Sequence, residues 1–125
     1  MTRTVLIVDD DDDIREVAQL SIEVGAGWTV LSASSGSAGA TLAAAERPDA
    51  ILLDVMMPGL DGPATLDRLQ SIAETRSIPV IFLTAKARPS EQERLAALGV
   101  AGVLSKPFDP MSLPGQISDM LGWSD

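Results

Sequence analysis

The sequence predicts an α/β fold: a doubly wound sheet of five parallel strands in the order 2-1-3-4-5, with helices on both faces. Five short apolar segments alternate along the chain with five segments of helical pattern. Each apolar segment is nearly continuous rather than alternating, which is typical of a strand that is buried on both faces of a parallel sheet. Because strands and helices alternate throughout, we expect right-handed crossovers between parallel strands.

The strands are expected at residues 4–8, 28–33, 50–53, 78–83 and 101–104. The third strand is the most informative, because its four apolar residues run directly into Asp54 and the turn at Pro58 and Gly59 follows soon afterwards. Asp54 is therefore expected at the carboxyl edge of the sheet, where open α/β folds bind their ligands. On this segment alone, a carboxylate that merely caps a turn is an equally good interpretation.

The first three helices follow from apolar spacing and composition. The expected buried face of the first helix consists of Ile14, Val17, Ala18, Ser21 and Val24. Gly25 and Gly27 are expected to end this helix. The alanine-rich residues 37–46 favour a second helix, and Pro63 is well placed as a first helical residue of the third.

The last two helices have less obvious starts. Ser90 and Glu93 match the S-x-x-E capping box, which predicts a fourth helix from there towards Gly99. The fifth helix could start after Asp109, but Pro114 would then lie inside it at a cost of about 3 kcal/mol. We therefore expect either a distorted first turn or a regular helix that begins only near Pro114.

Composition limits the possible functions. The 125 residues suit one domain, residues 1–125, without an output domain, and the apolar runs are too short to span a membrane. The absence of cysteine removes disulfides and thiolate metal sites and fits a cytoplasmic protein. A net charge of −9 argues against a nucleic-acid-binding surface. Because the chain has no histidine, any imidazole must come from another molecule.

Polar residues follow four of the predicted strands. These residues are Asp9 and Asp10, Asp54, Thr84, and Lys106. Parallel strands bring their carboxyl ends to one edge, so these groups are expected to converge there. Clustered carboxylates repel one another unless they take up protons or bind a cation, and hard oxygen ligands favour Mg²⁺. Asp54 would then be the nucleophile for a phosphoryl group, whose charge the metal and Lys106 would neutralise and to which Thr84 would donate a hydrogen bond.

Several of these residues also have simpler interpretations. The acidic run from Asp9 to Asp13 could be a solvated helix start, and we assign that role to Asp11, Asp12 and Asp13. A calcium loop is set aside because Ile14 stands where such a loop needs glycine. Trp28 and Trp123 are expected to be packing residues.

Together these residues resemble the receiver domain of response regulators in two-component signalling, over residues 5–121. The matching segments are Val8-Asp9-Asp10, Leu53-Asp54-Val55-Met56-Met57-Pro58-Gly59-Leu60-Asp61-Gly62, Leu83-Thr84-Ala85 and Ser105-Lys106-Pro107-Phe108. The resemblance implies a flavodoxin-like fold and an Asp54 that accepts phosphate from a phosphohistidine. The donor would be a sensor histidine kinase or a histidine phosphotransfer protein.

The resemblance also implies roles for single residues. Asp10 and Asp54 would bind Mg²⁺ directly, Asp9 through water, and Met56 through its backbone carbonyl. The Lys106–Pro107 bond would be cis and would direct the lysine into the site.

The sequence departs from the family pattern at Val103, where receivers usually carry a tyrosine or phenylalanine that follows the threonine. This weakens the expectation that a downstream partner reads the usual face, formed by the fourth helix, the fifth strand and the fifth helix. Pro114 alters the same face. Lys86 and Met56 occupy the positions that flank the phosphoryl site.

The leading prediction is a phosphorylation-dependent switch that acts on no substrate other than its own phosphoryl group. An unphosphorylated pseudo-receiver is the main alternative, although the complete set of acids, threonine and lysine argues against it. A phosphohydrolase with an aspartate nucleophile is a weaker alternative, because such enzymes generally have a second acidic residue two positions after the nucleophile, where this chain has Met56.

Overall fold

The computed structural model describes residues 2–85 and 88–124. The strands are β1 (Thr4–Val8), β2 (Thr29–Ala33), β3 (Ala50–Asp54), β4 (Val80–Thr84) and β5 (Gly102–Ser105). They form one sheet in the order β2-β1-β3-β4-β5, and every neighbouring pair is parallel. The predicted fold class and strand order are therefore confirmed.

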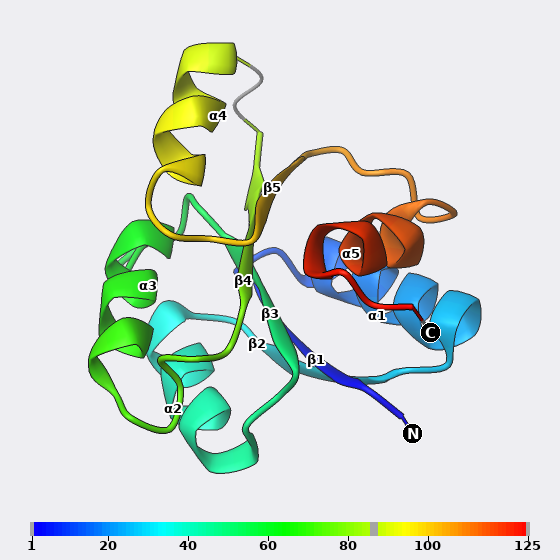
Figure 1. Cartoon of the computed structure of the whole chain (residues 1–125), viewed down its shortest axis with the longest axis horizontal. Coiled ribbons are helices and arrows are strands. Elements are labelled where there is room, and N and C mark those ends of the chain that lie inside the picture. The colour runs from blue at the N-terminus through cyan, green and yellow to red at the C-terminus, as the bar shows by residue number, and fades with distance from the viewer. Residues whose placement is uncertain (1, 86–87, 125) are drawn as a thin grey trace.

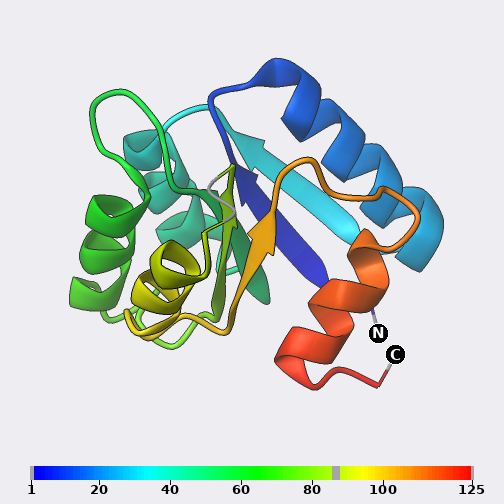
Figure 2. The ribbon, with the colours of Figure 1, turned by 90° about the horizontal axis from the view of Figure 1, so that it is seen from above.

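The helices are α1 (Asp12–Ala26), α2 (Gly36–Glu46), α3 (Gly62–Ser71), α4 (Pro89–Ala96) and α5 (Leu113–Leu121). Helices α1 and α5 cover one face of the sheet, and α2, α3 and α4 cover the other (Figures 1 and 2). Within residues 2–85 and 88–124, no helix combines the length and the apolar character that crossing a bilayer requires.

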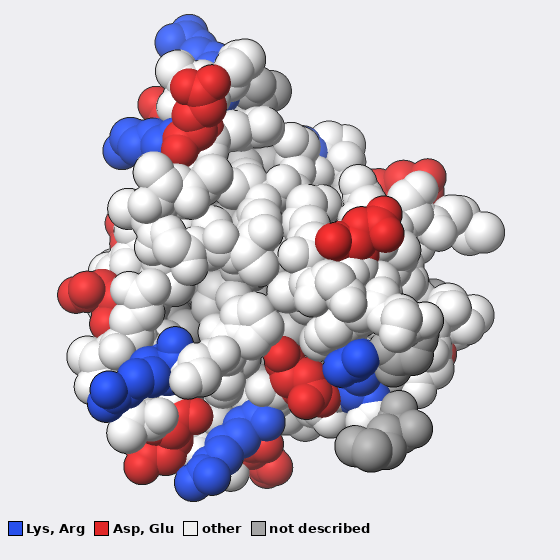
Figure 3. Space-filling model, viewed as in Figure 1, with Lys and Arg blue, Asp and Glu red and all other residues white. Residues whose placement is uncertain are grey.

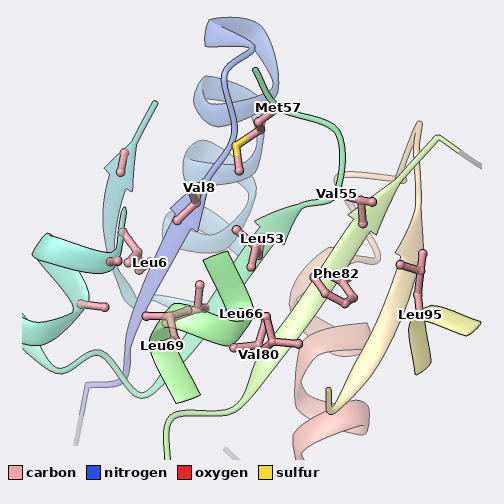
Figure 4. Close-up of a cluster of buried hydrophobic side chains, with 14 residues drawn as sticks. Leu6, Val8, Leu53, Val55, Met57, Leu66, Leu69, Val80, Phe82 and Leu95 are labelled. Carbon is pink, nitrogen blue, oxygen red and sulfur yellow. The ribbon is translucent and has the colours of Figure 1, made fainter. Parts of the chain in front are cut away.

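Successive side chains of a strand point alternately into two hydrophobic cores, one on each face of the sheet. On β1, Leu6 and Val8 point towards α2, α3 and α4, where they join Leu53, Leu66 and Phe82 (Figure 4). Val5 and Ile7 point the other way and pack with Ile22 of α1 and Ile117 of α5. Because successive side chains on a strand face opposite sides, a strand between two helical layers must be apolar throughout.

The predicted buried face of α1 is wrong in part. Val17 and Val24 are 42% and 78% exposed, whereas Ala18 and Ile22 are fully buried. Apolar residues lie almost all around this helix, so spacing alone does not identify which stripe faces the sheet. Gly25 does not end the helix either; it lies within it, and Gly27 at φ 71° forms the left-handed cap.

The predicted capping box of α4 is also wrong. Pro89 opens the helix and Arg88 is its N-cap residue, without a side-chain cap hydrogen bond, so Ser90 already lies in the first turn. Proline is favoured at the first helical position because its missing N–H would have no partner there. That preference outweighs the capping-box pattern one residue further on.

Helix α5 begins at Leu113, which confirms the second of the two predicted starts. A turn in which Ser112 N donates to Asp109 O at 3.0 Å precedes it. Pro114 therefore falls in the first turn, where it removes no helical hydrogen bond.

Trp28 and Trp123 pack as predicted, at the end of the sheet opposite Asp54. Their rings meet edge to face with centroids 5.1 Å apart, and the Arg3 guanidinium lies 4.0 Å from the Trp123 ring centroid. These contacts tie the segment after α5 to the starts of β1 and β2.

Candidate functional site

The register of the sheet explains why the polar residues converge. Val8 pairs with Leu53, Asp54 with Leu83, and Thr84 with Ser105. The carboxyl ends of β1, β3, β4 and β5 are thus level with one another. Asp9 and Asp10 are the first two residues after β1, and Lys106 is the first after β5, so the predicted site residues lie along one edge of the sheet.

Lys106 joins the two buried carboxylates. Its Nζ lies 2.7 Å from Oδ2 of Asp9 and 3.0 Å from Oδ1 of Asp54. Asp9 is fully buried and Asp54 is 4% exposed, whereas Asp10 is exposed. Because hydrogen bonds to ionised groups are strong in a partly desolvated site, the ammonium fixes the relative positions of these two acids.

The Asp9 carboxylate is also held from its own loop. Asp9 Oδ1 accepts a hydrogen bond from the backbone N–H of Asp11 at 2.9 Å. Asp11 in turn caps α1 by accepting from the backbone N–H groups of Asp13 and Ile14, which confirms the helix-start role assigned to it. Arg15, which the sequence did not suggest, donates from Nη1 to the Asp9 carbonyl at 2.6 Å. An arginine one turn into a helix that follows an acidic loop is the signal that could have identified it.

The loop between Asp54 and α3 packs closely against the backbone of Asp54 and Val55. Gly62 N donates to Val55 O at 2.9 Å, and a Cβ on Gly62 would lie 2.7 Å from both Asp54 O and Val55 Cα. Only glycine fits this approach without a shift of the backbone. Gly62 belongs to the segment that resembles the receiver pattern, but its spacing in the sequence does not reveal this packing role.

Both hydrogen bonds described for the Asp54 side chain end on Oδ1: one from Lys106 Nζ, and one from Met56 N at 3.4 Å. Oδ2 is thus the oxygen that these two donors leave available. The side chain of Met56 is 64% exposed at this edge.

The pKa values at the site reflect buried acids that lie close to one another and to Lys106. Burial is the largest influence on Asp54 and raises its pKa from 3.8 to about 6; the charge of Asp9 adds to this, and the hydrogen bond from Lys106 opposes it. For Lys106, burial alone would lower the pKa, but the hydrogen bonds and charges of Asp9 and Asp54 together outweigh it and raise the pKa. At neutral pH, Asp54 is therefore mostly ionised and Lys106 is charged.

The acidic residues fit a divalent cation. One carboxylate oxygen from each of Asp9, Asp10 and Asp54 lies within 4.8 Å of the others. Three oxygen ligands without histidine or cysteine are the donor set that Mg²⁺ prefers, and exposed Asp10 leaves the position open to water.

Thr84 is fully buried at the end of β4, and its carbonyl accepts a hydrogen bond from Lys106 N at 2.8 Å. The Lys106–Pro107 peptide bond is cis, as expected from the resemblance. Val103 is partly buried against the core on the α2, α3 and α4 side. Lys86 lies outside the described residues.

The comparisons with known proteins agree with this geometry. Residues 5–118 match the family described as the response regulator receiver domain. The transcriptional regulatory protein CseB of Streptomyces coelicolor is 38% identical over 94% of this chain and 48% of its own length. The phosphate regulon transcriptional regulatory protein PhoB of Pseudomonas aeruginosa is 34% identical over 95% of this chain and 52% of its own. The chain thus spans about half the length of the curated relatives it matches.

Solved structures extend the similarity to the whole fold. A putative response regulator from Chloroflexus aurantiacus superposes with a TM-score of 0.88 at 34% identity, covering 98% of this chain and 99% of its own. The chemotaxis protein CheY4 of Vibrio cholerae gives 0.87 at 28% identity over 96% and 99%. A family match over most of the chain, on a sheet that brings three acids and a lysine to one edge, identifies the chain as a member of the response regulator receiver domains of two-component signalling.

Proposed function

We propose that this receiver domain is a phosphorylation-dependent switch in which Asp54 accepts the phosphoryl group. The observation that carries the proposal is the Lys106 ammonium, which lies 2.7 Å from Asp9 and 3.0 Å from Asp54 with the Asp10 carboxylate close by. A cation beside a buried, largely ionised carboxylate is what a nucleophile needs to approach an anionic phosphoryl donor.

The donor is a phosphohistidine of a sensor histidine kinase or a histidine phosphotransfer protein. An Asp54 carboxylate oxygen forms a bond to phosphorus as the phosphorus–nitrogen bond breaks, and the imidazole leaves after protonation from solvent. The absence of histidine in this chain is consistent with a donor in trans.

Asp9, Asp10 and Asp54 would hold Mg²⁺, and the Met56 carbonyl would complete the protein ligands. The metal, when bound, supplies positive charge that neutralises the phosphoryl oxygens. Lys106 orients the Asp54 oxygen and then pairs with the product, and Thr84 donates its hydroxyl to a phosphoryl oxygen. The domain turns over no substrate besides its own aspartyl phosphate.

The output is a change in affinity for a protein partner at the face formed by α4, β5 and α5.

Lys and Arg do not gather into one patch on the face drawn in Figure 3, where acidic residues lie among them. With 9 basic and 18 acidic residues, the domain is poorly suited to hold nucleic acid by itself.

Incubation with a small phosphodonor and Mg²⁺, followed by intact mass measurement, tests the proposal. The parent protein is expected to gain one phosphoryl group, and Asp54→Asn none. Asp49→Asn is the matched control, because Asp49 precedes the same strand at its opposite end and accepts a hydrogen bond from Thr4 N at 2.7 Å. This variant should gain phosphate like the parent.

The alternatives predict different results in the same experiment. A pseudo-receiver would gain no phosphate at any Mg²⁺ concentration. A phosphohydrolase would turn over an added phosphoester steadily, whereas the switch should not.

A further inference from the structure

Ser105 links the phosphoryl site to helix α4. It is the last residue of β5, it pairs with Thr84, and the next residue is Lys106. The backbone N–H of Lys106 donates to the Thr84 carbonyl at 2.8 Å, so the ends of β4 and β5 are joined beside the site. A displacement of Thr84 or Lys106 towards Asp54 would therefore be transmitted to Ser105.

The side chain of Ser105 lies on the side of the sheet that carries α4. Residues two apart on a strand share a face, so Ser105 lies on the same face as Val103, which packs against the α4-side core. The Ser105 hydroxyl accepts a hydrogen bond from Gln92 Nε2 of α4 at 2.9 Å. This contact crosses from the helix to the strand only one residue from Lys106.

Helix α4 is lightly anchored in the described structure. It spans eight residues, its one buried residue is Leu95, and its N-cap residue Arg88 makes no side-chain cap hydrogen bond. A short helix with little buried apolar surface opens locally at low free-energy cost. One hydrogen bond at its middle can therefore shift how often it opens.

We propose that the Gln92–Ser105 hydrogen bond couples α4 to the phosphorylation state of Asp54. Val103 stands at the position where receivers usually carry an aromatic residue, and this hydrogen bond takes over the coupling role of that ring. The proposal rests on the function proposed above. When Thr84 and Lys106 move towards the phosphoryl oxygens, Ser105 is drawn with them and its hydrogen bond to Gln92 is lost. Helix α4 then opens more often, and the surface that it shares with β5 changes.

Amide hydrogen exchange of residues 89–96, measured by mass spectrometry on the full chain with Mg²⁺, tests this coupling. Phosphodonor should accelerate exchange in the parent protein about fivefold, the effect expected from the loss of one exposed hydrogen bond. Gln92→Ala should show the faster exchange without phosphate, with no further increase on phosphorylation.

Two variants separate this hydrogen bond from the other contacts of Gln92. Ser105→Ala should reproduce the behaviour of Gln92→Ala, and Ser105→Thr should restore the phosphate dependence because it keeps the hydroxyl. Gln116→Ala, on the exposed side of α5, is the matched glutamine control and should behave like the parent.

Intact mass measured in the same samples distinguishes the two proposals. Phosphate gain with unchanged exchange in α4, or a phosphate response that persists in both Gln92→Ala and Ser105→Ala, would overturn the coupling alone. Failure of the parent to gain phosphate would overturn the proposed function and the coupling with it.

Discussion

At the scale of single residues, Asp54 is held in a state that costs the apo protein stability. Its pKa is raised from 3.8 to about 6, mainly by burial. A carboxyl with a raised pKa contributes stability below its unfolded pKa and loses that contribution as the pH rises through the folded value. The carboxylate that the proposed phosphoryl transfer requires is thus the destabilising form, and a bound cation or phosphoryl group would relieve the cost.

Asp54→Asn is therefore expected to stabilise the metal-free protein, because asparagine resembles the protonated acid. The rise from 3.8 to about 6 is about two pKa units and one unit corresponds to about 1.4 kcal/mol, so the free energy of unfolding should rise by about 3 kcal/mol near pH 8. The gain should shrink as the pH falls through about 6 and disappear near pH 4. Urea unfolding at several pH values without Mg²⁺ measures it, and a gain that does not vary with pH would contradict the assignment.

Lys106 stabilises the folded protein, whereas ionised Asp54 destabilises it, because the ammonium compensates the charges of the buried Asp9 and Asp54 carboxylates. Lys106→Met should lower the free energy of unfolding by about 2–4 kcal/mol without metal, since it leaves the buried Asp9 and Asp54 carboxylates unpaired. Added Mg²⁺ should then raise the melting temperature of the variant by more than that of the parent, because the cation replaces the lost charge.

Arg94→Met is the control for the Lys106 variant, since Arg94 pairs with Glu91 but its side chain is 71% exposed. Such a surface pair is worth less than about 1 kcal/mol, and its removal should not change the response to Mg²⁺. Equal losses in the two variants would mean that Lys106 does not compensate the acids.

At the scale of elements, the loop from Asp54 to α3 depends on Gly62. A Cβ on Gly62 would lie 2.7 Å from two backbone atoms, which cannot rotate away. Gly62→Ala should therefore cost about 1–3 kcal/mol in urea unfolding and slow phosphate gain, because the backbone of Asp54 must shift.

The matched control for the loop is Gly115→Ala on α5, because nothing lies within 4 Å of a Cβ placed on Gly115. This variant should be neutral or stabilised by up to about 1 kcal/mol, with normal phosphate gain. If the two variants lost equal stability, close packing at Gly62 would not be the reason.

Helix α1 provides a test of which stripe faces the core. Ile22 is fully buried, whereas Val24, which spacing placed in the core, is 78% exposed. Ile22→Ala should lower the free energy of unfolding by about 2–5 kcal/mol, and Val24→Ala should change it by less than about 0.5 kcal/mol. Urea unfolding of both variants measures this, and comparable losses would contradict the observed orientation of α1.

At the scale of the whole molecule, sequence alone predicted the fold class, the strand order and the acids and lysine that meet at one edge. These features can be predicted because each of these polar residues lies at or just after the end of a buried strand in the sequence, and parallel strands bring their carboxyl ends to the same edge of the sheet. The orientation of α1 and the roles of Arg15 and Gly62 depend on which surfaces meet after packing. Local spacing does not contain that information, because helix faces and backbone approaches are decided by tertiary contacts.

The two ends of the sheet are expected to unfold together. Trp28 and Trp123, the only tryptophans of the chain, pack together at the end of the sheet opposite Asp54. The strands run from one end to the other between two cores, and every strand contributes side chains to both cores, although Val103 of β5 is only partly buried. We therefore expect cooperative unfolding, in which a ligand at the acidic edge protects the tryptophans as much as the rest of the chain.

Tryptophan fluorescence and far-UV circular dichroism should accordingly give the same urea midpoint, and Mg²⁺ should raise both midpoints equally. Trp123→Phe, which keeps an aromatic ring against Trp28, should retain the coincidence and show that Trp28 alone reports it. If Mg²⁺ raised the midpoint seen by circular dichroism and left the fluorescence midpoint unchanged, the segment after α5 would unfold independently of the acidic edge. Since a ligand stabilises only what unfolds together with its site, the size of the fluorescence shift measures how far the free energy of binding at Asp54 extends through the sheet.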